Sequence, residues 1–101
     1  MKRLLWWLLA GSRGGVNRAQ IIRTLHERPY NAHQLSEALG LDYKTVRHHL
    51  KILSENNVVV AQGKDNYGAM YFLSTAMEQG YADFLDIMRQ VSGDGDRLPP
   101  A

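Results

Sequence analysis

The sequence contains no cysteine among its 101 residues. Neither a disulfide nor a thiolate metal site is therefore available to this chain. The absence fits a reducing compartment, and we expect a cytoplasmic protein. This length predicts one domain. Because small folds bury a smaller share of their surface, we also expect an oligomer.

Long hydrophobic runs are also absent. The apolar run Leu4–Ala10 is far shorter than the about 20 residues that a membrane-spanning helix needs. Two cations precede it, as in a signal peptide, but no A-x-A cleavage site follows. We therefore expect no membrane contact and a short helix that packs, either on its own chain or against a second subunit.

The net charge is only +2, but the charge is unevenly distributed. The first 51 residues contain nine Lys or Arg and three Asp or Glu, whereas the remaining residues contain three and seven. Such asymmetry indicates either an anionic partner for the basic half or a random scatter over a solvated surface. Charge alone leaves both interpretations open.

Catalytic signatures are missing. No Ser/His/Asp or Cys/His pattern occurs in a plausible setting, and no glycine motif for nucleotides is present. The loop "GSRGGVNR" resembles a phosphate cradle but lacks the Lys-Ser/Thr ending of a P-loop. We expect neither an enzyme nor a bound cofactor.

Helix signals dominate the first half of the chain. Asn17 with Gln20, and Asn31 with Gln34, have the spacing of capping boxes at two helix starts. Pro29 would close the first of these helices. A further short helix is predicted before them, from the spacing of four leucines: Leu4, Leu5, Leu8 and Leu9.

A third capped helix follows a very short connection. Gly40 is a natural end for the preceding helix, and Asp42 is a typical N-cap for the next. That helix should end near Asn56 and Asn57, since asparagine tolerates the left-handed conformation.

The pattern then changes to strands. The segments 58–62 and 69–73 are β-branched or aromatic and flank a polar, glycine-containing stretch, which predicts a hairpin. A last helix is expected from Ser74 or Thr75, with Thr75 and Glu78 as a capping box. The fold class is thus mainly α with a small β-hairpin.

Two helices joined by the turn "GLD" predict a helix-turn-helix unit. In such a unit the second helix enters the major groove of DNA. Its buried stripe would be Val46, Leu50 and Leu53. The opposite face carries donors suited to DNA: Tyr43, Lys44, Arg47, His48 and Lys51. Arginine suits a bidentate contact to guanine and lysine suits phosphates.

The stretch "NAHQLSEALGLDYKTVRHHLKILSENNVV", followed by a hairpin ending "YFLS", resembles the winged helix-turn-helix of ArsR-like regulators. The frame L-(x)3-L-G-L-(x)4-V-(x)2-H-L-(x)2-L carries this resemblance over residues 17–74. The leading "WWLLAGSRGG" is similar to small archaeal members. The resemblance implies a transcriptional regulator that binds double-stranded DNA, with residues 43–56 as recognition helix.

The resemblance also implies that the wing, residues 63–68, lies on the minor groove or the DNA backbone. Its candidate contacts are Lys64, Asn66 and Tyr67, although a plain exposed loop is the competing interpretation. Arg13 and Arg18 are candidate contacts to the DNA backbone, or else part of a flexible connector.

His49 differs from its neighbour His48. It adjoins the buried stripe, and we interpret it as a structural histidine hydrogen-bonded between helices. The two side chains point about 100° apart and so do not easily chelate one ion. Relatives that sense metals need cysteines or Asp/His sets that this sequence does not offer. We expect no metal site, and the effector stays unknown.

Apolar helices at both ends predict a homodimer, with packing of the last helix on its own domain as the alternative. The candidate interface residues are Leu5, Trp6, Leu9, Tyr81, Phe84, Leu85 and Met88. The predicted organisation is thus an amino-terminal helix and loop, a DNA-binding domain, a dimerisation helix and a disordered tail, at residues 1–15, 16–74, 75–92 and 93–101. The alternative function is a winged helix that binds proteins and has no DNA-binding activity.

Overall fold

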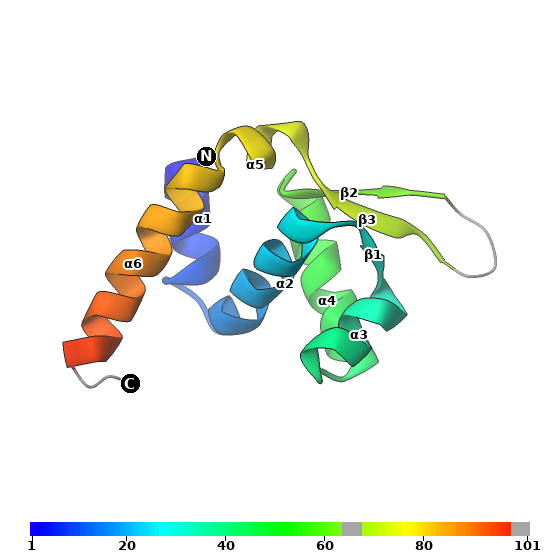
Figure 1. The fold of residues 1–101 in the computed structure, drawn as a ribbon, viewed down its shortest axis with the longest axis horizontal. Helices are drawn as coiled ribbons and strands as arrows, with labels where there is room; N and C mark the ends of the chain where they lie inside the picture. Colours follow the sequence, from blue (N-terminus) through cyan, green and yellow to red (C-terminus); the bar gives the residue numbers. More distant parts are fainter. Residues whose placement is uncertain (64–67, 98–101) are drawn as a thin grey trace.

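The computed structural model describes residues 1–63 and 68–97, with side chains through Val91 at the carboxyl-terminal end. Its elements, in chain order, are α1 (Lys2–Leu9), α2 (Gly15–Glu27), β1 (Tyr30–Asn31), α3 (Ala32–Leu39), α4 (Tyr43–Glu55), β2 (Val59–Gln62), β3 (Met70–Leu73), α5 (Thr75–Gln79) and α6 (Tyr81–Arg97). This is the predicted fold class, a winged helix-turn-helix with an added helix at each end (Figure 1).

The small sheet has the order β1-β3-β2, and both pairings are antiparallel. The hairpin of β2 and β3 was predicted, and Val59 pairs with Leu73 at its base. Strand β1 was not predicted because it is only two residues long. Its Tyr30 pairs with Tyr71, which ties the start of α3 to the hairpin.

The helix-turn-helix follows the predicted capping. Asn31 accepts a hydrogen bond from the backbone N–H of Gln34, whose side chain bonds back to complete the box. Gly40 ends α3 with φ of 66°, and the Asp42 carboxylate accepts from the first turn of α4. Asn57 takes up the predicted left-handed conformation after α4, with φ of 60°.

Helix α2 begins earlier than predicted. Gly14 is its N-cap, with φ of 80°, so the capping box of Asn17 and Gln20 is wrong. The reason is a close backbone crossing: a Cβ on Gly15 would collide with the carbonyl oxygen of Leu9. Two glycines therefore permit the sharp return from α1 into α2.

The last helix is divided in two. Ser74 caps α5 by accepting from Met77, and Gly80 then separates α5 from α6. The predicted capping box at Thr75 is wrong, because the Glu78 carboxylate instead bonds to His26 Nδ1 at 2.9 Å. Helix α6 extends to Arg97, so residues 93–97 are helical where a disordered tail was predicted. Residues 98–101 lie outside the described residues.

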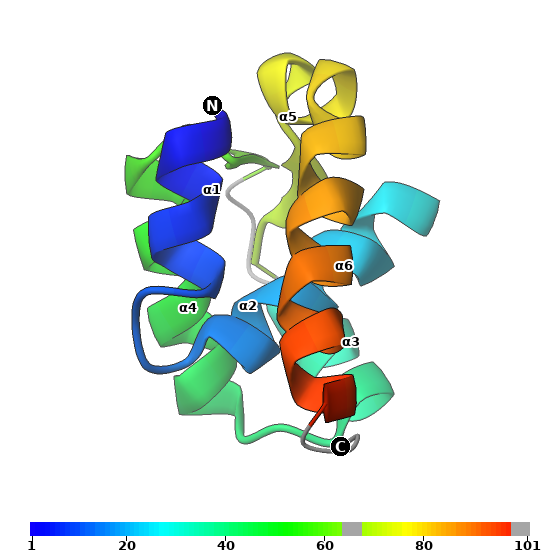
Figure 2. The ribbon, with the colours of Figure 1, turned by 90° about the vertical axis from the view of Figure 1, so that its left-hand side faces the viewer.

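Helices α1 and α6, from opposite ends of the chain, lie against each other (Figures 1 and 2). Lys2 Nζ and an Asp86 carboxylate oxygen join them at 2.7 Å. Three predicted interface residues, Leu5, Leu9 and Phe84, are buried in this chain's own core, so their assignment to a dimer interface is wrong. The physical reason is that α1 and α6 bury each other's apolar side chains.

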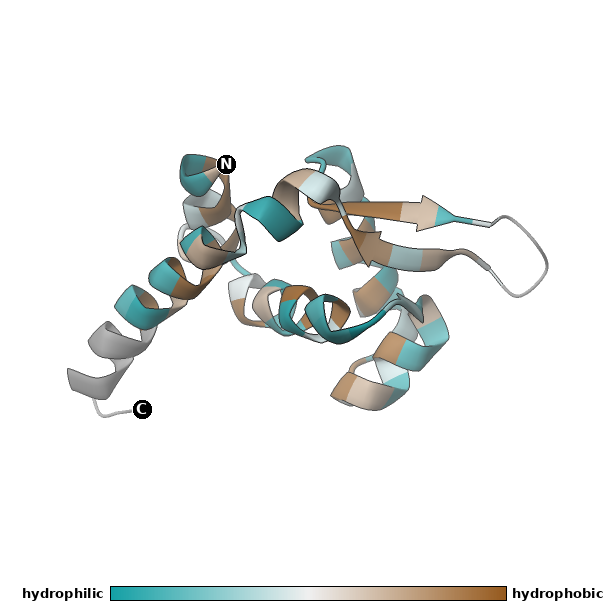
Figure 3. Ribbon diagram, turned by 45° about the horizontal axis from the view of Figure 1, so that its top comes forward, coloured by the Kyte–Doolittle hydropathy of each residue, from teal (hydrophilic) through white to brown (hydrophobic). Residues whose placement is uncertain are grey.

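The apolar core is continuous from the terminal helices to the base of the hairpin. Figure 3 shows hydrophobic and hydrophilic positions alternating around the helices, as amphipathic packing requires. In α4 the predicted stripe of Val46, Leu50 and Leu53 is fully buried. This burial fixes which face of α4 is left to solvent.

Candidate nucleic-acid interface

The exposed face of α4 gathers the predicted DNA-contacting side chains. The structure leaves Lys44, Arg47, His48 and Lys51 exposed and Tyr43 half-buried. The Asp42 carboxylate, which could repel DNA phosphates, is partly neutralised by the N–H groups of Lys44 and Thr45. The result is a cationic surface on a helix anchored by its opposite side.

Arg47 is held by a neighbour one turn earlier. Its Nη1 donates to the Tyr43 hydroxyl at 3.2 Å. The Tyr43 ring in turn stacks on His33, with centroids 4.2 Å apart and planes 14° from parallel. His33 comes from α3, and the sequence pattern does not predict this contact. Spacing within one helix carries no signal for such a contact between two helices.

Arg18 does not lie on the surface. Its side chain is only 4% exposed, so the prediction that it contacts the DNA backbone is wrong. Nε donates to the Leu8 carbonyl at 2.9 Å, and Nη2 donates to the Arg13 carbonyl at 2.8 Å and to the Ser12 hydroxyl. Arg18 therefore ties α2 to the end of α1 and to the loop that follows it.

His49 is the fourth group bonded to Arg18. Arg18 Nη1 lies 3.2 Å from His49 Nδ1, and the imidazole is 5% exposed. The interpretation of His49 as a structural histidine between helices is confirmed. Burial first, then the positive charges of Arg18 and His48, lower the pKa of His49 below its ordinary value of 6.5.

Arg13 stays exposed on the loop between α1 and α2. Its carbonyl is fixed by Arg18, and the loop is further held by Ser12, whose hydroxyl donates to the Trp7 carbonyl at 3.0 Å. The segment predicted as a flexible connector thus has defined hydrogen bonds. The Arg13 side chain is therefore accessible to an anionic partner, as the sequence predicts.

The hairpin projects away from the helices (Figure 1). The wing residues predicted to contact DNA, Lys64, Asn66 and Tyr67, lie outside the described residues. The ends of β2 and β3 that lead to them are exposed or half-buried at Gln62 and Met70.

The remaining predicted interface residues are distributed over α1 and α6. Trp6 is 43% exposed and Leu85 is 41% exposed, and the unpredicted Trp7 reaches 55%. Tyr81 is half-buried and stacks on His26, with centroids 3.6 Å apart. Large apolar surface therefore remains at both terminal helices after the chain has folded.

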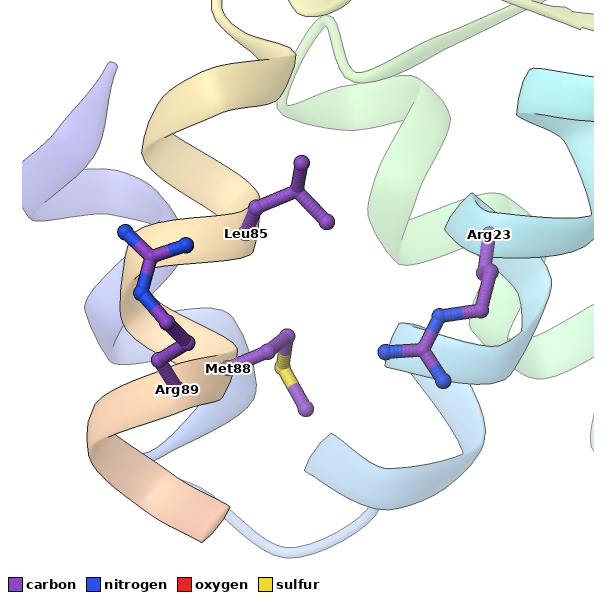
Figure 4. Close-up of a pocket in the computed structure, with 4 residues that line it drawn as sticks. All are labelled: Arg23, Leu85, Met88 and Arg89. Atoms are coloured by element: carbon purple, nitrogen blue, oxygen red, sulfur yellow. The ribbon is translucent and has the colours of Figure 1, made fainter. Parts of the chain in front are cut away.

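A pocket of about 240 Å³ opens between α2 and α6. It is lined by Arg23 of α2 and by Leu85, Met88 and Arg89 of α6 (Figure 4). Arg89 also donates to an Asp86 carboxylate oxygen at 3.2 Å. Two of the predicted interface residues, Leu85 and Met88, thus share one surface depression.

Among the side chains that the structure describes, no group of three or more His, Asp or Glu is arranged to hold a metal ion. Within residues 1–63 and 68–97, every helix is too short or too polar to span a bilayer.

Comparison with known proteins matches residues 15–60 to the family described as "Bacterial regulatory protein, arsR family". This segment contains α2, α3 and α4 and the start of β2. A comparison with curated proteins found no match. The matched segment includes all of α4, whose exposed face carries the candidate DNA contacts.

Several solved structures share the fold. A probable transcriptional regulator from Pseudomonas aeruginosa is 17% identical, with a TM-score of 0.73, over 99% of this chain and 76% of that chain. Diamide-treated YodB from B. subtilis is 22% identical, with a TM-score of 0.68, over 88% of this chain and 86% of that chain. A double mutant of ZitR from Lactococcus lactis is 15% identical, with a TM-score of 0.66, over 82% of this chain and 58% of that chain.

This chain therefore spans 58% of that ZitR chain, and 64% of the ZitR chain in the apo form. At these identities the likeness establishes the winged-helix fold.

Proposed function

We propose that the chain is a sequence-specific, DNA-binding transcriptional regulator that acts as a homodimer. The observation that carries the proposal is the cationic face of α4, exposed for more than two turns on a helix whose other face is fully buried. The match of residues 15–60 to a family of regulatory proteins supports it.

In this proposal the recognition helix, residues 43–56, enters the major groove. Arg47 makes a bidentate contact to guanine O6 and N7, and Tyr43 restricts its rotamers beforehand, which lowers the entropic cost of the contact. Lys44 and Lys51 neutralise phosphates, and His48 adds a further donor. Arg13 contacts the backbone beside the helix, and the wing, residues 63–68, lies on the minor groove or backbone.

The dimer would use the exposed Trp6 on α1 and Leu85 on α6, together with the half-buried Tyr81 and Met88 on α6. Large aromatic side chains are enriched at protein interfaces and often dominate their energetics. A two-fold dimer would place its recognition helices about 34 Å apart, one turn of DNA, and would select a pseudo-palindromic site.

DNA binding is tested by fluorescence anisotropy on a duplex selected from a random library, at about 50 mM and about 200 mM salt. Arg47→Ala should weaken binding by about 5- to 150-fold, the worth of one bidentate base contact. Arg47→Lys keeps the charge and should lose preference for the selected duplex while retaining binding to unselected DNA. Arg89→Ala, an exposed arginine on α6, is the matched control.

Two outcomes would contradict the proposal: no binding at low salt, or binding unchanged by replacing Lys44 and Arg47 together with alanine. Either result would favour the alternative function, a protein-binding winged helix. For the dimer, analytical ultracentrifugation should show self-association that Trp6→Ser weakens. A species of 11.5 kDa at every concentration would refute it.

A further inference from the structure

Arg18 is a buried cation that joins three parts of the molecule. Its guanidinium donates to the carbonyl at the end of α1, to the loop that carries Arg13, and to His49 on the recognition helix. The described part of the chain contains no buried side-chain nitrogen or oxygen without a hydrogen-bond partner. Arg18 is therefore a direct hydrogen-bonded link between the recognition helix and the loop that carries Arg13.

The contact with His49 requires a neutral imidazole. Arginine has five N–H donors and no acceptor, so His49 Nδ1 must accept and its proton must be on Nε2. A proton on Nδ1 would abolish the hydrogen bond and place a second positive charge 3.2 Å from the first.

The groups near His49 do not stabilise the positive charge that a second ring proton would add. The charged or titratable groups near it are Arg18 from α2 and His48 from α4 itself, and both disfavour the imidazolium. From the loop side, the ring meets the backbone of Gly14, where even an added Cβ would lie 2.6 Å from His49 Cε1. The loop therefore lies close against one side of the His49 ring.

We propose that Arg18 and His49 form a positioning pair through which proton uptake by His49 lowers the affinity for DNA. With His49 neutral, the pair holds the Arg13 loop and α4 in the arrangement that binds DNA. With His49 protonated, the two cations separate, the Arg13 carbonyl loses its donor, and the loop moves away from α4. This inference rests on the proposed DNA-binding function.

The neighbouring histidine should respond to pH with the opposite sign. His48 is exposed on the DNA-facing side, so its protonation adds a cation for phosphate to contact. His49→Asn places an amide oxygen where Nδ1 stands and does not titrate, whereas His48→Asn leaves the positioning pair intact. The two variants therefore separate the two effects.

The test measures DNA affinity by anisotropy from about pH 8 down to the pH at which the NMR signals of His49 show it protonated, because the pKa of His49 lies below that of an ordinary histidine. His48→Asn should lose about tenfold in affinity on acidification, a typical coupling between two sites. His49→Asn should not weaken on acidification, whatever its affinity at high pH. An equal acid loss in both variants would overturn the proposal.

A second measurement needs no DNA and no variant. Nitrogen NMR of the free protein should show His49 protonated on Nε2 alone at neutral pH. On acidification the Arg18 Nε–H and Arg13 amide signals should shift with the same midpoint as His49. If those signals stay fixed while His49 titrates, the pair does not open and the inference fails. If they shift but DNA never binds, the proposed function fails instead.

Discussion

Replacing Arg18 with alanine removes one buried cation and all four hydrogen bonds that it donates. Left behind are the carbonyls of Leu8 and Arg13, the Ser12 hydroxyl and His49 Nδ1. The Ser12 hydroxyl can still donate to backbone carbonyls of α1, so losing its bond from Arg18 costs little stability. The other three acceptors are left in a cavity between α1, α2 and α4.

The expected cost is about 3 kcal/mol. Hydrogen bonds that involve a charged group are worth roughly 1.5–3 kcal/mol each, and water entering the cavity offsets part of the loss. The substitution also removes the cost of burying the Arg18 charge away from water, which offsets more of the lost stability. For a domain of this size, such a loss lowers the melting temperature by about 12–24 °C.

Urea denaturation followed by circular dichroism measures this change. Arg13→Ala is the matched control, because it removes an exposed arginine from the same loop and leaves the backbone carbonyl in place. Its effect should stay within about 0.5 kcal/mol. A loss below about 1 kcal/mol for Arg18→Ala would refute the reasoning, since it would mean that desolvation cancels the hydrogen bonds.

Three further outcomes follow from local geometry. Gly15→Ala should lower thermal stability by well over about 1 kcal/mol, because the added methyl collides with Leu9, and unchanged melting would contradict the close crossing. Asp42→Ala should cost about 1 kcal/mol in urea denaturation through loss of the N-cap of α4. The lowered pKa of His49 means that the unfolded chain binds the proton first. Stability should therefore be complete above pH 6.5 and fall as pH drops below it, until the folded-state pKa is passed. His49→Asn should abolish this fall in stability, and an unchanged pH profile would contradict the assignment.

The helix-turn-helix could be predicted because its signals are local. A cap such as Asn31 or Asp42 bonds to the backbone two or three residues away, so spacing alone identifies it. The exposed face of α4 follows from the same argument, since burial of Val46 and Leu50 fixes the rotation of the helix.

Other features depend on contacts that are distant in the sequence. The start of α2 is set by the approach of Gly15 to Leu9 rather than by a capping side chain. Strand β1 forms because Tyr30 finds β3 about forty positions later, and two residues carry no strand pattern of their own. The stacking of His33 on Tyr43 similarly requires that α3 and α4 be placed first.

Arg18 is a different case, because a signal was present. It precedes Ile21, Ile22 and Leu25 by three, four and seven positions, the spacing of the buried stripe of α2. Its charge suggested a surface position, since arginine is almost never fully buried unless paired. An arginine on an apolar stripe is therefore better interpreted as a paired core residue.

The pairing of α1 with α6 also bears on the order and rate of folding. Lys2 and Asp86 are 84 positions apart, so joining them directly would close a loop of almost the whole chain. We expect that folding of the intervening winged helix brings the two ends near each other first, and that the terminal pair forms after the rate-limiting barrier. Substitutions between α1 and α6 should consequently speed unfolding while leaving the folding rate nearly unchanged. On this expectation, the terminal helices control the lifetime of the native state rather than the time needed to reach it.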